Sequence, residues 1–505
     1  MSSRFVLRVR LLTAALILMS LIIVAKLYLL QVVHGAEYSR RAQAQQVVSH
    51  NPLLNRGAIY FTDKDGQPIL AATLREVGTT TGHQRYYPGG SLAARTLGFV
   101  AYNNDDEQKG RYGLERYYEP VLGRSGEGLY RNFFVELFGA AQGALSGQAD
   151  KGDLITTIEP SVQGELERTL GEYEQAWHPG LSGGIVMDPH TGAIVAMALS
   201  PTFDLNEFNK EDDPTIYANP MAQNVYEMGS IMKPLTMAAG IDSGAVKETT
   251  TYNDTGCVTV DTKKICNHDG EARGTIPMQE VLSQSLNLGA SFVAQEMGPS
   301  TMREYFLEHY KLGEETGIDL PGEVRGLTDN LNGKQAVEFS TASFGQGIAV
   351  TPIEMTRALA VLANGGKLVT PHLANAIKEE SGITRALGWG EPKQVLKTET
   401  VTAVTRMLTE VVDTALANGD LKLEHWSIAA KTGTAQIANP AGGGYYKDRY
   451  LHSFFGYFPS YDPKFLVFLF AVEPQGAPFA SQTWAPPFKS LTKFLINYYN
   501  IPPDR

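Results

Sequence analysis

The chain has 505 residues, 43% of them hydrophobic, which is enough material for a large core and more than one domain. Its formal net charge is −11 at pH 7, so it carries no basic excess to displace counterions from phosphates, which excludes a nucleic-acid partner. It has ten histidines and two cysteines but no His-Glu-x-x-His pair and no Cys/His cluster, so we expect no metal and no cofactor.

A mostly apolar segment lies near the start of the chain. Residues 11–33 are dominated by Leu, Ile, Val and Ala and are long enough to span roughly 30 Å of membrane hydrocarbon. Three arginines among residues 1–10 precede it, and by the positive-inside rule they keep that short tail in the cytoplasm. No small-x-small cleavage site follows, so we expect an uncleaved, single-pass anchor with the rest of the chain outside. Lys26 within the span would snorkel to the outer interface or face a partner helix.

Two domains are expected after the anchor, and their predicted fold class is α+β. A polar stalk and an irregular, Gly-rich α+β domain would occupy residues 34–155. A larger domain is expected over residues 156–505, with an antiparallel sheet that carries helices on its faces and no further domain after its last helix. The strands expected there form two hairpins and one further strand, at residues 184–197, 453–472 and 431–436.

Ser230 and Lys233 form the first of three short motifs that carry chemistry. Ser230 precedes an apolar run of helical length, so we expect it to open a helix with Lys233 on the same face one turn later. A lysine desolvated in a cleft loses its proton more readily and can then act as a base. The alternative is a helix-capping serine beside a solvated lysine. The same spacing recurs at Ser490 and Lys493, which we interpret as a surface piece of the last helix.

The second and third motifs follow in chain order. Ser285-Leu286-Asn287 separates two helical patterns and is expected to be a tight connection, whose hydroxyl can relay a proton and whose amide can orient a substrate. Lys431-Thr432-Gly433-Thr434 follows an apolar run and is typical of a strand with a glycine at a point of close approach. Its lysine and hydroxyls suit a carboxylate, although an exposed strand end is the alternative. The ordered trio supplies the parts of an acyl-transfer site.

Other patterns are interpreted as structural. Gly180-Leu181-Ser182-Gly183-Gly184 fits Gly-x-Ser-x-Gly but precedes a strand, whereas a nucleophile elbow lies between a strand and a following helix. The aromatic residues between 445 and 457 are interpreted as strand packing rather than a sugar platform. Outside the cytoplasm, Cys257 and Cys266 would form either a disulfide, worth at most about 3 kcal/mol, or two free thiols.

The ordered trio resembles the active site of the penicillin-binding protein and serine β-lactamase superfamily. Other stretches are similar to landmarks of the class B penicillin-binding proteins: Arg56-Gly57-Ala58-Ile59, Asp63-Lys64-Asp65-Gly66, Arg85-Tyr86-Tyr87-Pro88-Gly89-Gly90, Gly98-Phe99-Val100, Gly113-Leu114-Glu115, Met187-Asp188-Pro189-His190-Thr191-Gly192 and Ser343-Phe344-Gly345-Gln346-Gly347. Glu159 stands where the family often has Asp. The resemblance implies a pedestal (dimerisation-like) domain, then a penicillin-binding transpeptidase domain, on a bacterial inner-membrane anchor.

The resemblance also implies a function and roles for residues. It implies a D,D-transpeptidase that cross-links peptidoglycan stem peptides ending in D-Ala-D-Ala and is acylated by β-lactams. Ser230 would attack the carbonyl between the two terminal D-alanines, Lys233 would take its proton, and Ser285 would pass it to the departing D-alanine. The substrate-binding residues implied are Asn287, Lys431, Thr432, Gly433 and Thr434, with an oxyanion hole from the backbone N–H groups of Ser230 and Thr434.

The implied partners are a SEDS-family glycan polymerase and other divisome or elongasome membrane proteins. The compact pedestal and modest length favour the cell-division type and septal wall synthesis. An elongation-type transpeptidase, a hydrolytic relative such as a D,D-carboxypeptidase or β-lactamase, and a non-catalytic scaffold are the alternatives.

Overall fold

The computed structural model describes residues 56–77, 82–102, 108–123, 151–439 and 441–505, together with Thr13, Leu18, Met19 and Lys26. The described residues from 56 onwards belong to one compact unit. The expected cytoplasmic tail, the stalk and most of the expected anchor lie outside the described residues. Within the described residues, no helix combines the length and apolar character needed to cross a membrane.

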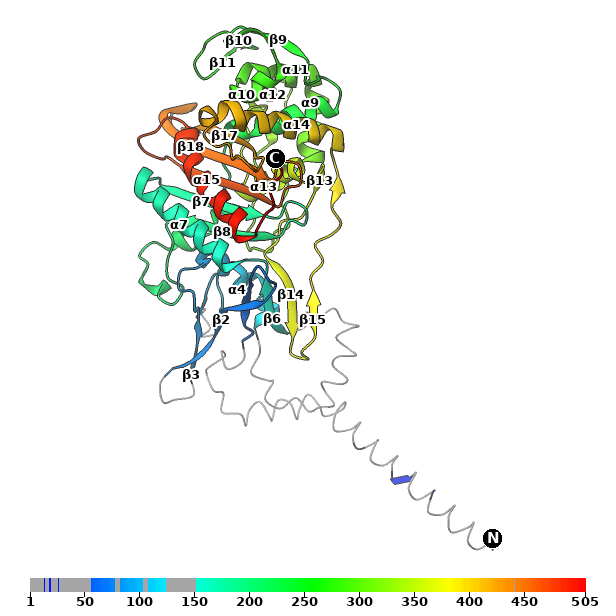
Figure 1. The fold of residues 1–505 in the computed structure, drawn as a ribbon. Coiled ribbons are helices and arrows are strands. Elements are labelled where there is room, and N and C mark those ends of the chain that lie inside the picture. The colour runs from blue at the N-terminus through cyan, green and yellow to red at the C-terminus, as the bar shows by residue number, and fades with distance from the viewer. Residues whose placement is uncertain are drawn as a thin grey trace, which may run out of the picture. The chain divides into compact units, whose positions relative to one another are not determined.

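A six-stranded sheet organises the first part of this unit (Figure 1). Its strands lie in the order β15-β14-β6-β1-β2-β3. Their bounds are β1 Ile59–Thr62, β2 Pro68–Val77, β3 Gly82–Tyr86, β6 Gly152–Thr156, β14 Ala374–Glu379 and β15 Thr384–Ala386. β6 pairs in parallel with β1 and antiparallel with β14. The hairpin β14–β15 therefore joins the first sheet, although its sequence position puts it among residues expected in the second domain.

Short elements surround this sheet, and a buried ion cluster lies among them. These elements are α3 Ala94–Leu97, β4 Val100–Tyr102, β5 Gln108–Gly110, α4 Gly113–Tyr117 and α5 Glu119–Leu122. The fully buried Glu115 carboxylate accepts hydrogen bonds from Arg56 Nε at 2.8 Å and Arg85 Nε at 2.6 Å. A buried charge is tolerated only when it is paired and hydrogen-bonded. Three of the stretches quoted from the sequence thus meet at one carboxylate.

The second part of the unit is built on a five-stranded antiparallel sheet in the order β17-β18-β19-β7-β8. The bounds are β7 Leu181–Met187, β8 Ile194–Ser200, β17 Ala429–Ala438, β18 Tyr445–Phe458 and β19 Phe465–Val472. The central strand β19 is apolar and buried at every position but its last, as expected of a strand covered on both faces. Both predicted hairpins and the predicted third strand are confirmed.

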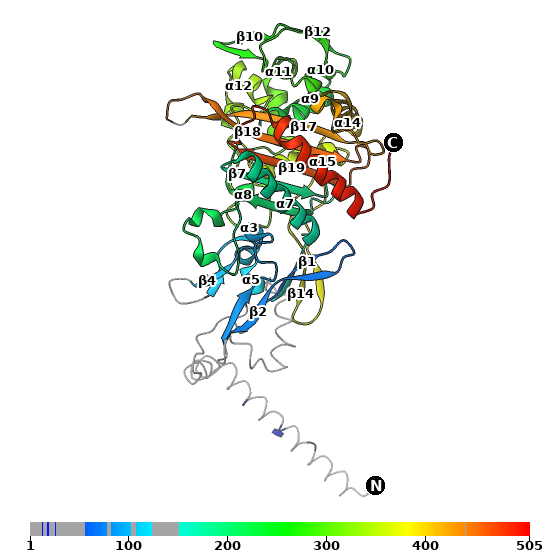
Figure 2. The same ribbon diagram turned by 60° about the vertical axis from the view of Figure 1, so that its left-hand side comes forward.

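Helices cover both faces of this sheet (Figures 1 and 2). On one face lie α7 Pro160–Trp177 and α15 Ala480–Tyr498, whose Tyr173 and Trp484 rings stack with centroids 3.8 Å apart. On the other lie α13 Pro352–Ala363 and α14 Thr398–Glu410. The remaining larger helices are α9 Lys233–Asp242, α10 Met278–Ser283, α11 Asn287–Arg303 and α12 Ala336–Ala342. The predicted α+β layer architecture is confirmed.

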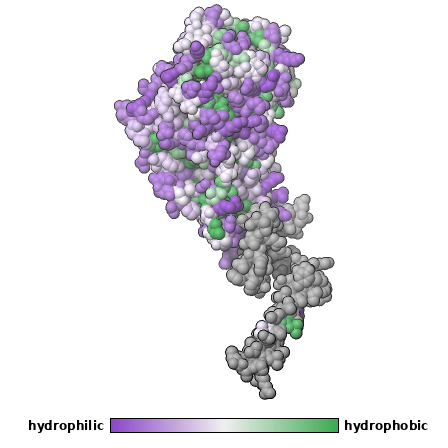
Figure 3. Space-filling view, turned by 90° about the vertical axis from the view of Figure 1, so that its right-hand side faces the viewer, coloured by the Kyte–Doolittle hydropathy of each residue, from purple (hydrophilic) through white to green (hydrophobic). Residues whose placement is uncertain are grey.

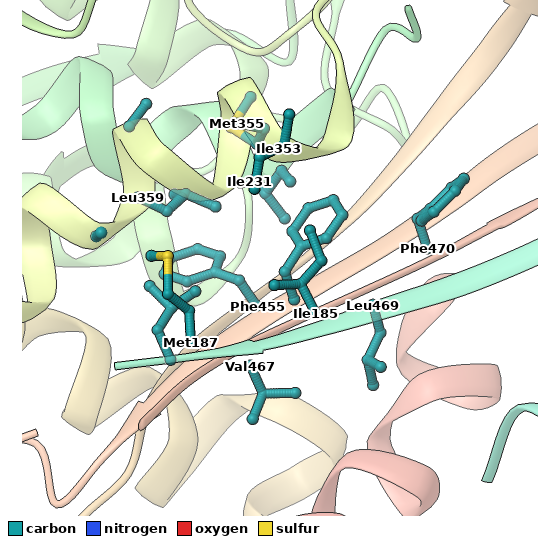
Figure 4. Close-up of a cluster of buried hydrophobic side chains, with 14 of the residues drawn as sticks. Ile185, Met187, Ile231, Ile353, Met355, Leu359, Phe455, Val467, Leu469 and Phe470 are labelled. Atoms are coloured by element: carbon teal, nitrogen blue, oxygen red, sulfur yellow. The ribbon is translucent and has the colours of Figure 1, made fainter. Parts of the chain in front are cut away.

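The core follows the two-residue repeat of the strands. Figure 4 shows Ile185, Met187 and Phe455 directed towards α13, whereas Val467 and Leu469 point to the opposite face of the sheet. Helix α13 is anchored by a capping box in which the Thr351 side chain accepts from the Glu354 N–H and the Glu354 side chain accepts from the Thr351 N–H. The face of this unit in Figure 3 is mostly hydrophilic, with scattered apolar residues.

Candidate active site

Ser230 lies in a short 3₁₀ turn, η6 (Gly229–Met232), that runs directly into α9. The predicted helix start is therefore confirmed, with its first turn tightened. Ser230 is half-buried, and its hydroxyl has no hydrogen-bond partner within the described part of the chain. Gly229 has a φ of +66°, and its N–H donates to Gly345 O at 3.1 Å. A Cβ on Gly345 would lie 2.2 Å from Gly229 O, so only glycine allows this support beneath the serine.

The three motifs meet at the Ser285 hydroxyl. Lys233 Nζ lies 2.5 Å from Ser285 O and 3.2 Å from Ser285 Oγ, to which Lys431 Nζ donates at 2.9 Å. Lys233 and Lys431 are 1% and 3% exposed. Lys233 and Lys431 are 52 and 146 residues from Ser285 along the chain, and both lie within hydrogen-bond distance of it. The alternative of a solvated lysine after a helix cap is wrong for Lys233.

Burial changes the charge state of both amines. It lowers the pKa of Lys233 well below its usual value, and the nearby Lys431 lowers it further. Burial also lowers the pKa of Lys431 to about 7. Two ammonium groups beside one hydroxyl repel each other where water cannot screen them, so the charged form of one is disfavoured. The arrangement therefore favours the neutral amine at Lys233.

Ser285 occupies the tight connection predicted between two helices, α10 and α11. Its φ is +54°, in the left-handed region that residues with a Cβ adopt at an energetic cost. This turn directs both the carbonyl and the hydroxyl of Ser285 to Lys233. Backbone strain at this position therefore serves to bring a polar side chain between two amines.

Strand β17 lies tightly against the turn that carries Ser230. A Cβ on Gly433 would be 2.4 Å from Ser453 Oγ and 2.7 Å from Met228 O, so the predicted close approach at this glycine is confirmed. Thr432 and Thr434 are half-buried at the same edge, and Thr434 Oγ1 accepts from Ala480 N at 3.1 Å. The edge beside Ser230 therefore presents an amine and two hydroxyls.

Asn287 is braced by a disulfide-bonded hairpin. Its Nδ2 donates to Cys266 O at 3.0 Å. Cys266 is joined to Cys257 by a disulfide, and the two residues face each other across β10 (Cys257–Val260) and β11 (Lys263–Cys266). Of the two alternatives drawn from the sequence, the structure contains the disulfide. The Asn287 amide is thereby oriented by an element on a separate hairpin.

Glu227, which no sequence pattern singled out, adjoins the site. Its Oε1 accepts from Gly347 N and from Tyr445 OH, both at 3.1 Å. Its Oε2 is buried without a hydrogen-bond partner among the described residues, and burial raises the pKa of this carboxyl. The only local sequence signal that could have pointed to Glu227 is its position three residues before Ser230. The contact with Tyr445 forms only when β18 lies over the turn.

The rival motifs lie away from this cluster. Ser182 is fully buried in β7, which rules out a nucleophile elbow there. Ser490 and Lys493 are exposed on α15, as predicted. The aromatic residues Phe454 and Phe455 are buried in β18, which confirms strand packing for them. Within the described residues, no three His, Cys, Asp or Glu side chains are grouped so that they could hold a metal.

Residues 183–493 match the penicillin binding protein transpeptidase domain. The chain belongs to this family. Among relatives of this penicillin-binding protein, Stage V sporulation protein D of Bacillus subtilis is 29% identical over 430 residues, which cover 82% of this chain and 64% of the relative. Peptidoglycan D,D-transpeptidase FtsI of Escherichia coli is 27% identical over 470 residues, which cover 90% and 75%. The chain thus spans about two thirds to three quarters of the length of these relatives.

Solved structures agree with the family. The crystal structure of penicillin binding protein 3 from Mycobacterium tuberculosis matches with a TM-score of 0.77 at 25% identity, covering 90% of this chain and 98% of that chain. The same protein complexed with aztreonam and with ampicillin matches equally well. The predicted resemblance to class B penicillin-binding proteins of the division type is confirmed.

Proposed function

We propose that this penicillin-binding protein is a serine D,D-transpeptidase that cross-links peptidoglycan stem peptides through an acyl-enzyme on Ser230. The observation that carries the proposal is the convergence of two buried amines, Lys233 and Lys431, on the Ser285 hydroxyl. Ser230, at the start of the helix that carries Lys233, has no hydrogen-bond partner for its hydroxyl among the described residues. The name of the Escherichia coli relative, a peptidoglycan D,D-transpeptidase, supports this assignment.

In the first step, Ser230 Oγ bonds to the carbonyl carbon between the two terminal D-alanines, and the C–N bond to the last D-alanine breaks. The neutral Lys233 amine takes the hydroxyl proton. Ser285, within reach of both amines, relays one proton to the departing amine, so Lys233 ends the step neutral. Losing the Lys233 amine would interrupt this relay.

In the second step, the amine of a neighbouring stem peptide attacks the ester carbonyl. A new peptide bond forms, and the bond from the carbonyl carbon to Ser230 Oγ breaks. One proton of the attacking amine returns through Ser285 and Lys233 to the serine oxygen. The result is a cross-link and a regenerated enzyme.

We assign the edge strand to substrate binding. Lys431, Thr432 and Thr434 would hold the terminal carboxylate, while Gly433 lets the strand lie close to Ser230. Asn287 would bind the peptide amide. The backbone N–H groups of Ser230 and Thr434 would form the oxyanion hole, where losing one donor typically costs about 3–4 kcal/mol of barrier. Since a β-lactam presents the same amide and carboxylate, we expect it to acylate Ser230. The aztreonam and ampicillin complexes of the mycobacterial neighbour support this.

The test is intact-mass analysis of the full chain treated with a penicillin. A stable penicilloyl adduct is expected for the unmodified chain and for Ser490→Ala, which alters the second Ser-x-x-Lys motif. No adduct is expected for Ser230→Ala. An adduct on Ser230→Ala would refute the assigned nucleophile, and an adduct that disappears within minutes would favour a hydrolase over a transpeptidase.

We further propose where the enzyme works. Residues 11–33 would anchor it in the bacterial inner membrane, with a pedestal from residue 34 to 155 and the transpeptidase domain from 156 to 505, apart from the β14–β15 hairpin. Septal wall synthesis, with a SEDS-family polymerase and other divisome proteins as partners, fits its division-type relatives. A fluorescent fusion should therefore gather at the septum, and an even distribution along the lateral wall would contradict this role.

A further inference from the structure

A hollow lies on the surface of the part built on the five-stranded sheet, between the last helix and the loop before β17. Its volume is about 410 Å³, within the range of small-molecule sites. On one side it is lined by Lys489, Lys493 and Asn497 of α15, and on the other by Lys422 and Trp426. None of these residues belongs to the cluster around Ser230.

The polar residues of α15 that line this hollow are evenly spaced along the helix. Lys489, Lys493 and Asn497 recur every four residues, so they form one stripe along α15. Ala480 at the start of the same helix donates its N–H to Thr434 Oγ1. Lys493 lies thirteen residues further along, about 20 Å away at 1.5 Å per residue. The hollow is therefore connected to the active-site strand by a single helix but is distinct from it.

The lining carries an excess of positive charge in a chain that is acidic overall. Three lysines line it against one carboxylate, that of Glu424, whose side chain is 87% exposed. Lys493 has no hydrogen-bond or ion-pair partner within the described residues, and Lys489 Nζ bonds only to the carbonyl of Asp420. Lys422 lies 3.7 Å from Asp413, a carboxylate already engaged by Arg505 at 2.6 Å. The lysines are thus largely uncompensated.

The hollow also has an apolar, aromatic side. Trp426 is half-buried, and its ring is fixed because Nε1 donates to Ile501 O at 3.1 Å. Ile496 completes this lining. A fixed indole beside an aliphatic side chain offers a flat apolar surface, while the lysines and Asn497 offer hydrogen-bond donors. A lone phosphate would fill little of a hollow of about 410 Å³.

We propose that this hollow binds an anionic saccharide, a sugar ring packed on Trp426 with its carboxylate or phosphate held by Lys489 and Lys493. The acid could belong to a peptidoglycan fragment or to a phosphate-bearing wall polymer, since both present a sugar with a negative charge. Binding there does not involve Ser230 and stands apart from the acyl-transfer function.

The experiment measures the binding of four soluble probes to the full chain in detergent by calorimetry. The probes are a disaccharide-tripeptide, which lacks the D-Ala-D-Ala end, a phosphorylated chitotriose, neutral chitotriose and inorganic phosphate. The variant is Lys493→Glu, an exposed position without a partner, and the matched control is Lys393→Glu, another exposed lysine. A second variant, Lys489→Gln with Lys493→Gln, removes charge without reversing it.

Lys493→Glu should weaken binding of at least one anionic probe about tenfold or more, because a charged hydrogen bond is lost. Lys393→Glu should leave it unchanged, and penicillin acylation should be equal in all variants. Preference for the disaccharide-tripeptide or the phosphorylated chitotriose identifies the source of the anion. Equal affinities in Lys493→Glu and Lys393→Glu, no binding of either anionic probe, or inorganic phosphate binding as tightly as both would overturn the proposal.

Discussion

Two buried lysines with different tasks define the site at the scale of single residues. In the proposed mechanism, Lys233 must be neutral to accept a proton, whereas Lys431 must be charged to hold a carboxylate. Burial lowers the pKa of both, and the charge on Lys431 lowers that of Lys233 further. We therefore expect the proposed reaction to be fastest where Lys431 is still protonated and Lys233 is not.

This difference predicts the pH dependence of acylation. Burial lowers the pKa of Lys431 to about 7, so its ammonium is present below that pH and is lost above it. The second-order rate constant for acylation by benzylpenicillin, which bears a carboxylate, should fall as pH rises through about 7. The maximal rate at saturation should fall less, because a bound carboxylate stabilises the ammonium. Stopped-flow measurements from pH 5.5 to 9 check this.

Lys431→Arg provides the control for this prediction, because a guanidinium stays charged throughout that range. Its acylation should be slower in absolute terms, since an arginine does not fit the same geometry. However, the alkaline fall near pH 7 should disappear. An unchanged fall in Lys431→Arg would assign the titration to another group.

At the scale of elements, the close packing of β17 on η6 decides whether the motifs can meet. Gly433 allows the strand to approach to a distance at which a Cβ would contact Ser453 Oγ and Met228 O. The Ser453 hydroxyl can rotate away, but the Met228 carbonyl is backbone. Any side chain at this position must therefore push the strand away from the turn that carries Ser230.

Gly433→Ala should reduce the penicillin acylation rate at least about a hundredfold, because a displacement of about 1 Å at a reacting centre has that effect. Thermal unfolding and acylation kinetics together give the measurement. The matched control is Gly171→Ala in α7, where a Cβ meets nothing within 4 Å. It should stabilise the fold by about 0.5–1 kcal/mol and leave acylation unchanged. An acylation rate in Gly433→Ala equal to that of the unmodified chain would show that β17 can move without slowing acylation.

At the scale of the whole molecule, one buried carboxylate connects the two parts of the compact unit. Asp319 accepts hydrogen bonds from Leu373 N at 2.7 Å and Ala374 N at 2.9 Å, where β14 begins. It also accepts from the hydroxyl of Tyr118, between α4 and α5, at 2.9 Å. Burial raises the pKa of Asp319 to about 6, while the Tyr118 hydrogen bond opposes that rise.

Tyr118→Phe should therefore destabilise the fold in a pH-dependent manner. Above about pH 6 Asp319 is ionised, and losing a hydrogen bond to a buried charge should lower the free energy of unfolding by about 1.5–3 kcal/mol. At pH 5 the carboxyl is protonated and the loss should be smaller. Denaturant unfolding at pH 5 and pH 8 measures both. The neighbouring Tyr117→Phe, at a 44% exposed position, should have little effect at either pH. An equal loss for Tyr118→Phe at the two pH values would contradict the role of the ionised carboxylate.

The sequence alone determined the features that depend on local patterns. Short apolar runs beside turn residues located the strands of the five-stranded sheet, and three ordered motifs located Ser230, Ser285 and Lys431. These predictions hold because an apolar run bounded by a turn and the start of a helix are both set by residues within a few positions of one another. The same reasoning correctly set aside Ser182 and Ser490.

Only the tertiary structure decided what depends on contacts between distant segments. It added β14–β15 to the first sheet, brought Glu227 to Tyr445, and joined Asn287 to the disulfide hairpin. It also set the charge of Lys233 and Lys431, because desolvation and a neighbouring ammonium exist only once the chain has folded around them. The sequence names the residues of the candidate site, and burial shifts the pKa values of its two lysines.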